Sequence, residues 1–386
     1  MKLVVTIPAQ NEEKTIAQVV AGVPRNLPGI SETEVIVMDD GSTDATARLA
    51  REAGAIVVPI HGRPGLGKVF KTGMDRAMRR GADIICNIDG DGQFNPGDIA
   101  KLVIPLLSDD ADFVTCSRFK DPSLWPTMPA VKFWGNKVVT RMINWVCGGT
   151  TFSDVSCGFR AFSREAAYRL TLFGRYTYTQ ECFIDLFSKG MRIVEVPLAV
   201  RGVREHGKSR VAGSVLKYAT NSLPIIIRAM RDIQPLKFFG GIAATLAVPC
   251  AVALLFVAGW YAYTAVADGR ARTSPFTQLI TIAGIGMVIS FLMGMLALLA
   301  DMMGRHRRIS EELLYLARKK LYQNRRPPKP SVAVAHTSHR LSLHDSWVLP
   351  VIKSVPEDAT SKARDDDASI DEVEEEIAMA AAAMKR

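Results

Sequence analysis

The sequence predicts an α/β domain followed by two transmembrane helices, for three reasons. Short β-branched runs alternate with helical patterns through the first half, which is typical of a mostly parallel sheet with helices on both faces. Two later stretches without a charged residue each exceed the ~20 residues that cross a bilayer. Hydrophobic residues make up 48% of the 386 residues, which is enough to bury a substantial core.

Five runs in the first half are predicted as strands, and three stretches between them as helices. The strand runs are residues 2–7, 34–38, 55–60, 83–88 and 112–117, and the helical stretches are 12–20, 43–53 and 69–80. Ligands of such sheets bind beyond the carboxyl ends of the strands. A ligand site is therefore expected where Asp39 and Asp40 close the second run and Asp89 closes the fourth.

The two uncharged stretches, residues 238–267 and 273–300, are predicted to cross a membrane. Core helices of soluble proteins are seldom apolar all round for such a length. Trp260, Tyr261 and Tyr263 fit an aromatic belt at the membrane surface. Lys and Arg are more numerous on the two outer flanks than in the intervening loop, so both flanks are expected on the cytoplasmic side of the inner membrane. The first residues show no cleavable signal pattern, which fits a cytoplasmic N-terminal domain and cytoplasmic termini.

The predicted layout has five parts: a folded domain at 1–212, amphipathic juxtamembrane helices at 213–236, two transmembrane helices within 237–303, a basic cytoplasmic helix at 304–326 and a mostly disordered acidic tail at 327–386. An ordinary packed helix remains an equal alternative for the amphipathic segment. Residues 331–386 carry 6 Lys and Arg against 11 Asp and Glu, so the net charge is −5 there and +14 on residues 1–330. The basic part suits phosphates or an anionic lipid surface, and no motif supports a nucleic-acid partner.

A segment with alternating polar residues, Asp89-Gly-Asp91-Gly-Gln93, carries the strongest chemical signal. On an extended chain the two carboxylates and the amide project to one side. Three hard oxygen ligands of this kind suit Mg²⁺ or Mn²⁺ bridging a diphosphate. A calcium EF-hand is excluded because Phe94 and Ala100 stand where its loop needs Gly and Glu. A polar turn built by Asp and Gly remains an alternative.

Two further loops lie at predicted strand ends. In the first, Ser42 or Thr43 is expected to cap a helix with Asp44 in its first turn, while Asp39 and Asp40 remain available to a ribose or base. The second, residues 62–68, is close to a phosphate-binding P-loop, but Val69 stands where the magnesium-binding Ser or Thr is required. An ATPase or GTPase is therefore disfavoured, although the glycines and Lys68 suit a diphosphate.

Taken in order and spacing, the motifs resemble family 2 glycosyltransferases with the Rossmann-like GT-A fold. The segments are Thr6-Ile-Pro-Ala-Gln-Asn-Glu-Glu13, Asp39-Asp-Gly-Ser-Thr-Asp44, Gly65-Leu-Gly-Lys68 and Asp89-Gly-Asp-Gly-Gln93. The chain is similar to the polyprenyl-phosphate branch, the dolichyl- or undecaprenyl-phosphate mannose and glucose synthases, in Ser117-Arg-Phe119, Ser156-Cys-Gly-Phe-Arg160, Gln180-Glu181 and Arg204-x-x-Gly207-x-Ser209. The resemblance covers about residues 1–232, and two C-terminal spans are a known arrangement in that branch.

This resemblance implies a role for each matching residue. Nucleotide-sugar binding falls to Pro8, Asn11, Glu13, Asp39, Asp40, Ser42, Gly67, Lys68, Asp89 and Gln93. Metal binding falls to Asp89, Asp91 and Gln93, and binding of the acceptor phosphate to Arg118, Lys132, Ser156, Arg204 and Ser209. Asp91 and Arg118 are the implied catalytic residues. Arg118 could instead form a structural ion pair, and Arg160 could pair with Glu181.

The implied reaction transfers a hexose, with inversion, from a nucleotide sugar of the UDP-glucose or GDP-mannose class to a polyprenyl phosphate. The second pKa of a lipid monophosphate is about 6, so the acceptor arrives as a dianion that needs no strong base. A homo-oligomer is left open. Two alternatives remain: a processive polysaccharide synthase, although the chain lacks a Gln-x-x-Arg-Trp segment and further spans, and a non-catalytic membrane scaffold.

Overall fold

The computed structural model describes residues 1–60, 65–172, 178–202, 224, 227–228, 230–267, 269 and 274–323. The chain divides into a unit of Met1–Lys329 and a second unit of Pro330–Arg386, which lies outside the described residues. The expected acidic tail and most of the expected amphipathic segment at 213–236 therefore also lie outside them.

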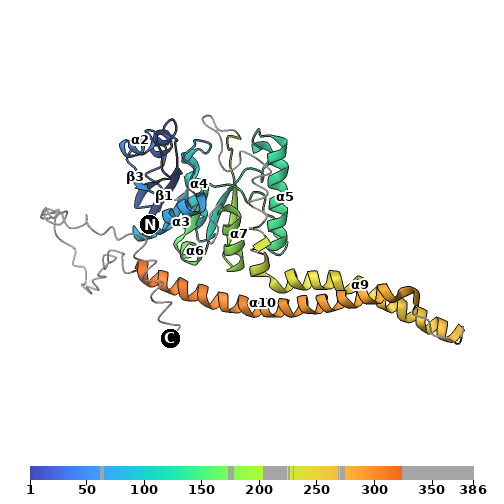
Figure 1. Ribbon diagram of the computed structural model, residues 1–386. Coiled ribbons are helices and arrows are strands. Elements are labelled where there is room, and N and C mark those ends of the chain that lie inside the picture. The colour runs from blue at the N-terminus through green and yellow to red at the C-terminus, as the bar shows by residue number, and fades with distance from the viewer. Residues whose placement is uncertain are drawn as a thin grey trace, which may run out of the picture. The chain divides into compact units, whose positions relative to one another are not determined.

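The described part of the chain contains one mixed sheet of seven strands in the order β3-β2-β1-β4-β6-β5-β7 (Figure 1). Strand β6 is antiparallel to its neighbours β4 and β5, and the other neighbouring pairs are parallel. The strands are β1 Lys2–Ala9, β2 Glu32–Asp39, β3 Ile56–Pro59, β4 Ile84–Asn87, β5 Phe113–Ser117, β6 Arg160–Ser163 and β7 Ile193–Pro197. All five predicted strands are confirmed, and β6 and β7 extend the sheet beyond them.

Helices cover both faces of the sheet because its central strands bury apolar side chains on both sides. Along β1, Leu3, Val5 and Ile7 enter one core, and Val4 enters the other. The first core also receives α1 Ile16–Ala21, α2 Thr46–Glu52 and α4 Ile99–Leu107. The second receives α3 Leu66–Arg79, α5 Ala130–Val146, α6 Arg164–Arg169 and α7 Thr179–Ser188. Short 3-10 turns lie at Pro96–Asp98, Pro122–Leu124 and Ser274–Phe276. The predicted α/β class is confirmed.

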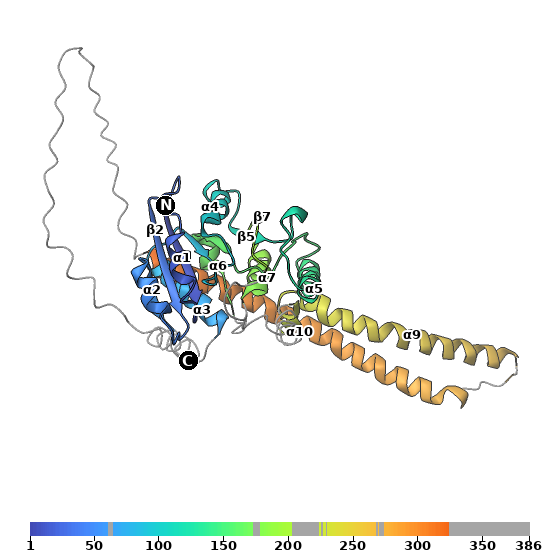
Figure 2. The same ribbon diagram turned by 90° about the horizontal axis from the view of Figure 1, so that it is seen from above.

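Two long apolar helices, α9 Pro235–Ala267 and α10 Thr277–Gln323, run side by side in both views (Figures 1 and 2). Ser290 Oγ on α10 donates to the Ala243 carbonyl on α9 at 2.7 Å. In the most apolar stretch of each helix, only 11% and 17% of the residues are buried inside the protein. Helices from a soluble core would be mostly covered, so both helices are candidate membrane spans.

The second of these helices continues past its apolar stretch and packs against the sheet domain. Arg318 Nη1 donates to the Leu170 carbonyl at 2.7 Å, and the Tyr322 hydroxyl donates to Asp75 at 2.5 Å. Tyr322 is buried in the core beneath α3 and α6. The residues expected to form a separate basic helix at 304–326 are thus, as far as Gln323, the end of α10.

Candidate functional site

The loops that follow β1 and β2 are hydrogen-bonded to each other at the carboxyl edge of the sheet. The Asn11 backbone N–H donates to Ser42 Oγ at 3.0 Å, and Asn11 Oδ1 accepts from the Thr43 N–H at 2.8 Å. The Ser42 N–H donates to Asp39 Oδ1 at 3.0 Å. Asn11 has a φ of +56°, in the left-handed region that Asn tolerates better than most residues. The structure therefore brings together three of the predicted nucleotide-binding residues.

The expected helix cap at Ser42 or Thr43 is wrong. Helix α2 begins at Thr46, after Ala45, and no side chain caps it. Ser42 Oγ is occupied by the neighbouring loop, and Asp44 Oδ1 accepts from the Thr46 N–H at 3.0 Å. Glu13 Oε2 accepts from the Ala45 N–H at 3.2 Å, so Glu13 also joins the two loops. Packing between loops outweighs the local preference for a cap here.

The remaining nucleotide-side residues lie along the same edge. Pro8 is near the end of β1, and its carbonyl accepts from the Gly90 N–H at 3.3 Å. Asp40 directly follows β2. Gly67 and Lys68 form the first turn of α3, where Gly67 is buried and Lys68 is exposed. Because α3 follows β3, a neighbour of β2, its N-terminus opens toward this edge.

The segment from Asp89 to Gln93 begins one residue after Ile88, just beyond the end of β4, as expected. Asp91 is only 3% exposed, and its Oδ1 accepts from the Gln93 N–H at 3.0 Å. Gln93 Nε2 donates to the Arg201 carbonyl at 2.8 Å. That bond fixes the amide and leaves its Oε1 on the opposite side of the group.

Asp89 lies against the backbone of Gly158. A Cβ at position 158 would lie 2.8 Å from Asp89 Oδ2, so a side chain there would collide with the carboxylate. Asn87 Nδ2 donates to the Gly158 carbonyl at 3.0 Å and to the Tyr178 hydroxyl at 2.9 Å. Burial, and secondarily the Asp89 charge, raises the pKa of Tyr178 well above its usual value. Gly158 therefore lets this loop approach the candidate metal ligands.

The oxygen donors fit a divalent cation that is shared with a ligand. Among the described residues, no group of three or more His, Cys, Asp or Glu side chains could hold a metal alone. Two carboxylates and an amide oxygen form the kind of incomplete set on which Mg²⁺ relies when phosphates and waters supply its other ligands.

Arg118, at the end of β5, forms a two-pronged ion pair with Asp154. Its Nε and Nη2 donate to the two carboxylate oxygens at 2.6 Å and 2.9 Å, and its backbone N–H donates at 3.2 Å. The side chain of Asp154 is 0% exposed and that of Arg118 is 21% exposed. Burial alone lowers the pKa of Arg118, but the charge and hydrogen bonds of Asp154 outweigh it and raise that pKa. The ion-pair alternative is thus realised, and the Arg118 side chain remains partly exposed.

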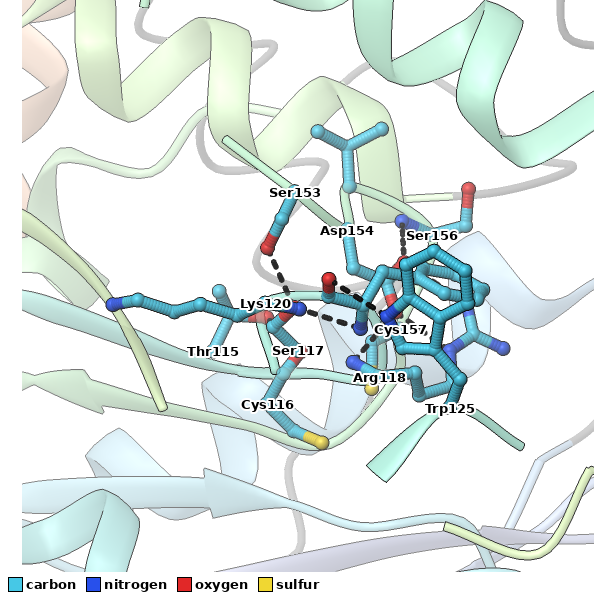
Figure 3. A network of polar contacts seen from close by, with 12 residues as sticks. Thr115, Cys116, Ser117, Arg118, Lys120, Trp125, Ser153, Asp154, Ser156 and Cys157 are labelled. Atoms are coloured by element: carbon cyan, nitrogen blue, oxygen red, sulfur yellow. Dashed lines mark hydrogen bonds and ion pairs between the residues drawn. The ribbon is translucent and has the colours of Figure 1, made fainter. Parts of the chain in front are cut away.

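A polar network surrounds this pair (Figure 3). The Ser156 N–H donates to Asp154 Oδ1 at 3.1 Å, which joins Ser156 to Arg118 through one carboxylate. Ser117 Oγ and Ser153 Oγ are hydrogen-bonded at 2.6 Å. The sequence prediction missed Asp154. Its only signal was an acidic residue two positions before Ser156, a spacing typical of a turn in which the side chain accepts from the backbone.

The other predicted acceptor-side residues are Lys132, Arg204 and Ser209. Lys132 lies on α5, and among the described residues its side chain makes no polar contact with Arg118 or Ser156. Arg204 and Ser209 lie outside the described residues. Arg160 does not pair with Glu181, because its guanidinium donates to the carbonyls of Cys157, Thr179 and Val155 at 2.7, 2.7 and 3.0 Å. Arg160 is therefore a structural residue that shapes the Ser156 loop.

Comparison with known proteins finds similarity in the same domain. The profile of the Glycosyl transferase family 2 matches residues 4–171. The UDP-N-acetylglucosamine–dolichyl-phosphate N-acetylglucosaminyltransferase of Methanococcus voltae is 33% identical over 212 residues, covering 50% of this chain and 82% of that protein. The polyprenol monophosphomannose synthase of Mycolicibacterium smegmatis is 29% identical over 233 residues, covering 56% and 84%. Glucosyl-3-phosphoglycerate synthase from Mycobacterium tuberculosis, a solved structure, is 26% identical with a TM-score of 0.46, covering 60% of this chain and 79% of that one.

Proposed function

Because this chain belongs to family 2 of the glycosyltransferases, we propose that it transfers a hexose from a nucleotide sugar to a polyprenyl phosphate at a membrane surface. Both named relatives use a polyprenol-type acceptor, by their names, and this chain covers more than four fifths of each. The proposal extends their acceptor class to this chain and leaves the sugar and the nucleotide base open.

One observation carries the proposal. The loops after β1, β2 and β4 meet at one edge of the sheet, and the Arg118–Asp154 pair after β5 lies on the same edge. The first three loops suit an anionic nucleotide sugar, and the arginine suits a second anion, the acceptor phosphate. The same chain carries two apolar helices that suit a membrane, where a polyprenyl phosphate resides.

The residues fit a displacement that needs no protein base. A lipid phosphate whose second pKa is about 6 is largely a dianion at neutral pH. Arg118 and Ser156 would orient this nucleophile through charge-assisted hydrogen bonds toward the anomeric carbon. A single displacement forms the bond from phosphate oxygen to sugar and breaks the bond to the nucleoside diphosphate, which inverts the anomeric centre.

Asp89, Asp91 and Gln93 would hold Mg²⁺ or Mn²⁺ together with the donor diphosphate. When bound, such an ion neutralises charge that develops on the departing diphosphate. The buried position of Asp91 and the fixed amide of Gln93 support this assignment. Lys68 and the N-terminus of α3 would add positive potential beside the same phosphates.

The membrane arrangement follows the basic flanks. Arg228, Arg231 and Lys237 precede or begin α9, and Arg305, Arg307 and Arg308 follow the apolar part of α10. We therefore place the catalytic domain on the cytoplasmic face. The donor nucleotide sugar is then drawn from the cytoplasm, while the acceptor reaches the site from the inner leaflet.

The test is to incubate membranes that contain the protein with undecaprenyl phosphate and each of UDP-glucose, UDP-N-acetylglucosamine and GDP-mannose. Mass analysis should detect a lipid phosphate carrying a single sugar from one donor, and EDTA should suppress it. A polymeric product would support a processive synthase. Nucleotide-sugar binding without any transfer would support a scaffold. Product formation in excess EDTA would show that the reaction needs no divalent metal.

A further inference from the structure

Two carboxylates, those of Glu195 and Asp154, link β7 to the end of β5 through hydrogen bonds. Glu195 on β7 accepts the Ser153 N–H with both oxygens at 2.9 Å, and the Ser153 hydroxyl with Oε2 at 2.9 Å. Its Oε1 also accepts the Asp154 N–H at 2.9 Å. Glu195 thus fixes the backbone from which the Asp154 side chain projects.

Donors from the protein occupy all four acceptor sites of the Asp154 carboxylate. Three donors come from Arg118, at 2.6, 2.9 and 3.2 Å, and the fourth is the Ser156 N–H at 3.1 Å. An ionised carboxylate offers about four acceptor sites. Asp154 is fully buried and saturated, so it does not serve as a metal ligand or as a base.

The effect on Arg118 is one of orientation. A guanidinium is planar and carries five N–H groups in a fixed fork. Asp154 takes the edge formed by Nε and one Nη2 hydrogen, so the Nη1 edge faces away from it. Among the described residues, no protein acceptor is bonded to Nη1 of Arg118, and its side chain is 21% exposed.

We propose that Asp154, fixed by Glu195, is a positioning residue that presents the free edge of Arg118 to the acceptor phosphate. This inference rests on the proposed function. Without Asp154 the long arginine side chain would lose rotamer freedom on binding the phosphate, and the phosphate would bind less tightly. Pre-orientation removes that loss and also fixes the angle at which the phosphate approaches the sugar.

The test compares two aspartates that each form an ion pair with an arginine, one at each end of β5. In Asp154→Asn, one oxygen that faces the arginine becomes an NH₂ donor, so the fork is broken while the volume is kept. We expect the KM for polyprenyl phosphate to rise about tenfold, equivalent to about 1.4 kcal/mol, while the KM for the nucleotide sugar changes less than about twofold. The intact donor KM also reports that the variant is folded.

Asp112 provides the matched control. At the other end of β5, Arg192 Nε and Nη2 donate to Asp112 at 3.0 and 3.1 Å, in the same two-pronged geometry. Asp112→Asn should leave both KM values at their wild-type levels. A rise in acceptor KM in this control would mean that weakening any Arg–Asp pair next to β5 has the effect, which overturns the proposal.

Two further variants separate orientation from general damage. Glu195→Gln keeps one acceptor oxygen, so its acceptor KM should rise less than that of Asp154→Asn, again without a change in donor KM. In an Arg118→Lys background, Asp154→Asn should add almost nothing, because a lysine has no fork to orient. Additive effects on the acceptor KM in the double variant would contradict a positioning role for Asp154. If Asp154→Asn does not bind the donor, the KM values of Glu195→Gln for acceptor and donor are compared instead.

The outcomes distinguish the two levels of inference. If the wild-type protein makes no polyprenyl-phosphate sugar from any donor, the proposed function fails. If the wild type does so and Asp154→Asn keeps a wild-type acceptor KM, or raises both KM values equally, the function stands and the positioning role is overturned.

Discussion

Asp91 and Asp154 are both buried in the site, yet they organise different parts of it. Asp91 accepts the Gln93 N–H and so shapes the turn that carries the amide. Asp154 accepts from Arg118 and Ser156 and so shapes the loop that holds the proposed acceptor-phosphate residues. Replacing either residue should therefore disturb one substrate far more than the other.

For Asp91, the informative change is Asp91→Asn. The asparagine keeps an oxygen for the Gln93 N–H but loses the negative charge that a metal requires. We expect transfer to fall by more than about a hundredfold, with an unchanged unfolding temperature. A suitable control is Asp98→Asn on the nearby surface turn, where Asp98 pairs with Lys101 at 2.9 Å. Wild-type turnover by Asp91→Asn would show that Asp91 is not a required metal ligand.

For Arg160, the expected effect concerns stability. Its side chain is fully buried, donates to three carbonyls and lies against the rings of Phe113 and Phe183. Arg160→Met leaves those carbonyls unpaired at about 1 kcal/mol each, or about 3 kcal/mol in all. Arg192→Met, at a half-exposed arginine, should change the free energy of unfolding much less. Equal losses in denaturant titrations would show that burial is not the cause.

The sequence predicted the donor side of the site better than the acceptor side, for a physical reason. Asp39, Asp89 and Asp91 stand in contiguous motifs at strand ends, so their neighbourhood follows from the local pattern. Asp154 and Glu195 act only because the fold brings β5, β6 and β7 together, and neither lies in a motif. Arg118 was recognised, but its partner could not be.

Among the elements, prediction succeeded where apolar runs are long and failed where pairing is distant. Strands β1 to β5 follow β-branched runs. Strand β6, Arg-Ala-Phe-Ser, has four residues and becomes a strand only by pairing antiparallel with β4 and β5. Helix α10 shows the opposite difficulty, because its composition changes from apolar to basic while one helix continues through both parts.

The junction of α7 with α10 contains a pH-sensitive group. Asp185 on α7 is nearly buried, accepts from Lys189 at 2.9 Å and lies in a cluster that includes Glu311 of α10, 3.6 Å from Lys189. Burial raises the pKa of Asp185 to about 6 from an ordinary 3.8, despite the lowering effect of Lys189. Because the folded-state pKa is the higher one, this group stabilises the fold fully below about pH 4, and that contribution is lost as the pH rises through about 6.

We therefore expect the free energy of unfolding of Asp185→Asn, relative to that of the wild type, to rise by up to about 3 kcal/mol as the pH increases from 4 to 7. Thermal unfolding in detergent across this range measures the difference. Asp112→Asn should behave in the opposite sense, because hydrogen bonds from Arg192 lower the pKa of Asp112 and its stabilisation is lost as the pH falls. A constant gap between Asp185→Asn and wild type would show that Asp185 keeps an ordinary pKa.

For the whole molecule, the end of α10 is a structural part of the catalytic domain. Tyr315 and Tyr322 are both buried in its core, and Arg318 holds the turn after α6. A chain ending at residue 234 should therefore unfold at a lower temperature than the full chain, because removal of the two tyrosines exposes apolar surface. A chain ending at residue 329 retains the helix and should unfold like the full protein. Equal unfolding temperatures for all three would show that α10 only tethers the domain.

Because α10 is a single helix of 47 residues, it is about 70 Å long, whereas a bilayer core is about 30 Å thick. In the proposed membrane arrangement, the part of α10 outside the bilayer packs against the sheet domain through Arg318 and Tyr322. The protein and the proposed lipid acceptor would then meet by diffusion in the plane of one leaflet, and the rate would depend on how many acceptor molecules occupy each area of membrane. Diluting the membranes in buffer should leave turnover per enzyme unchanged, while diluting the acceptor with inert lipid should lower it.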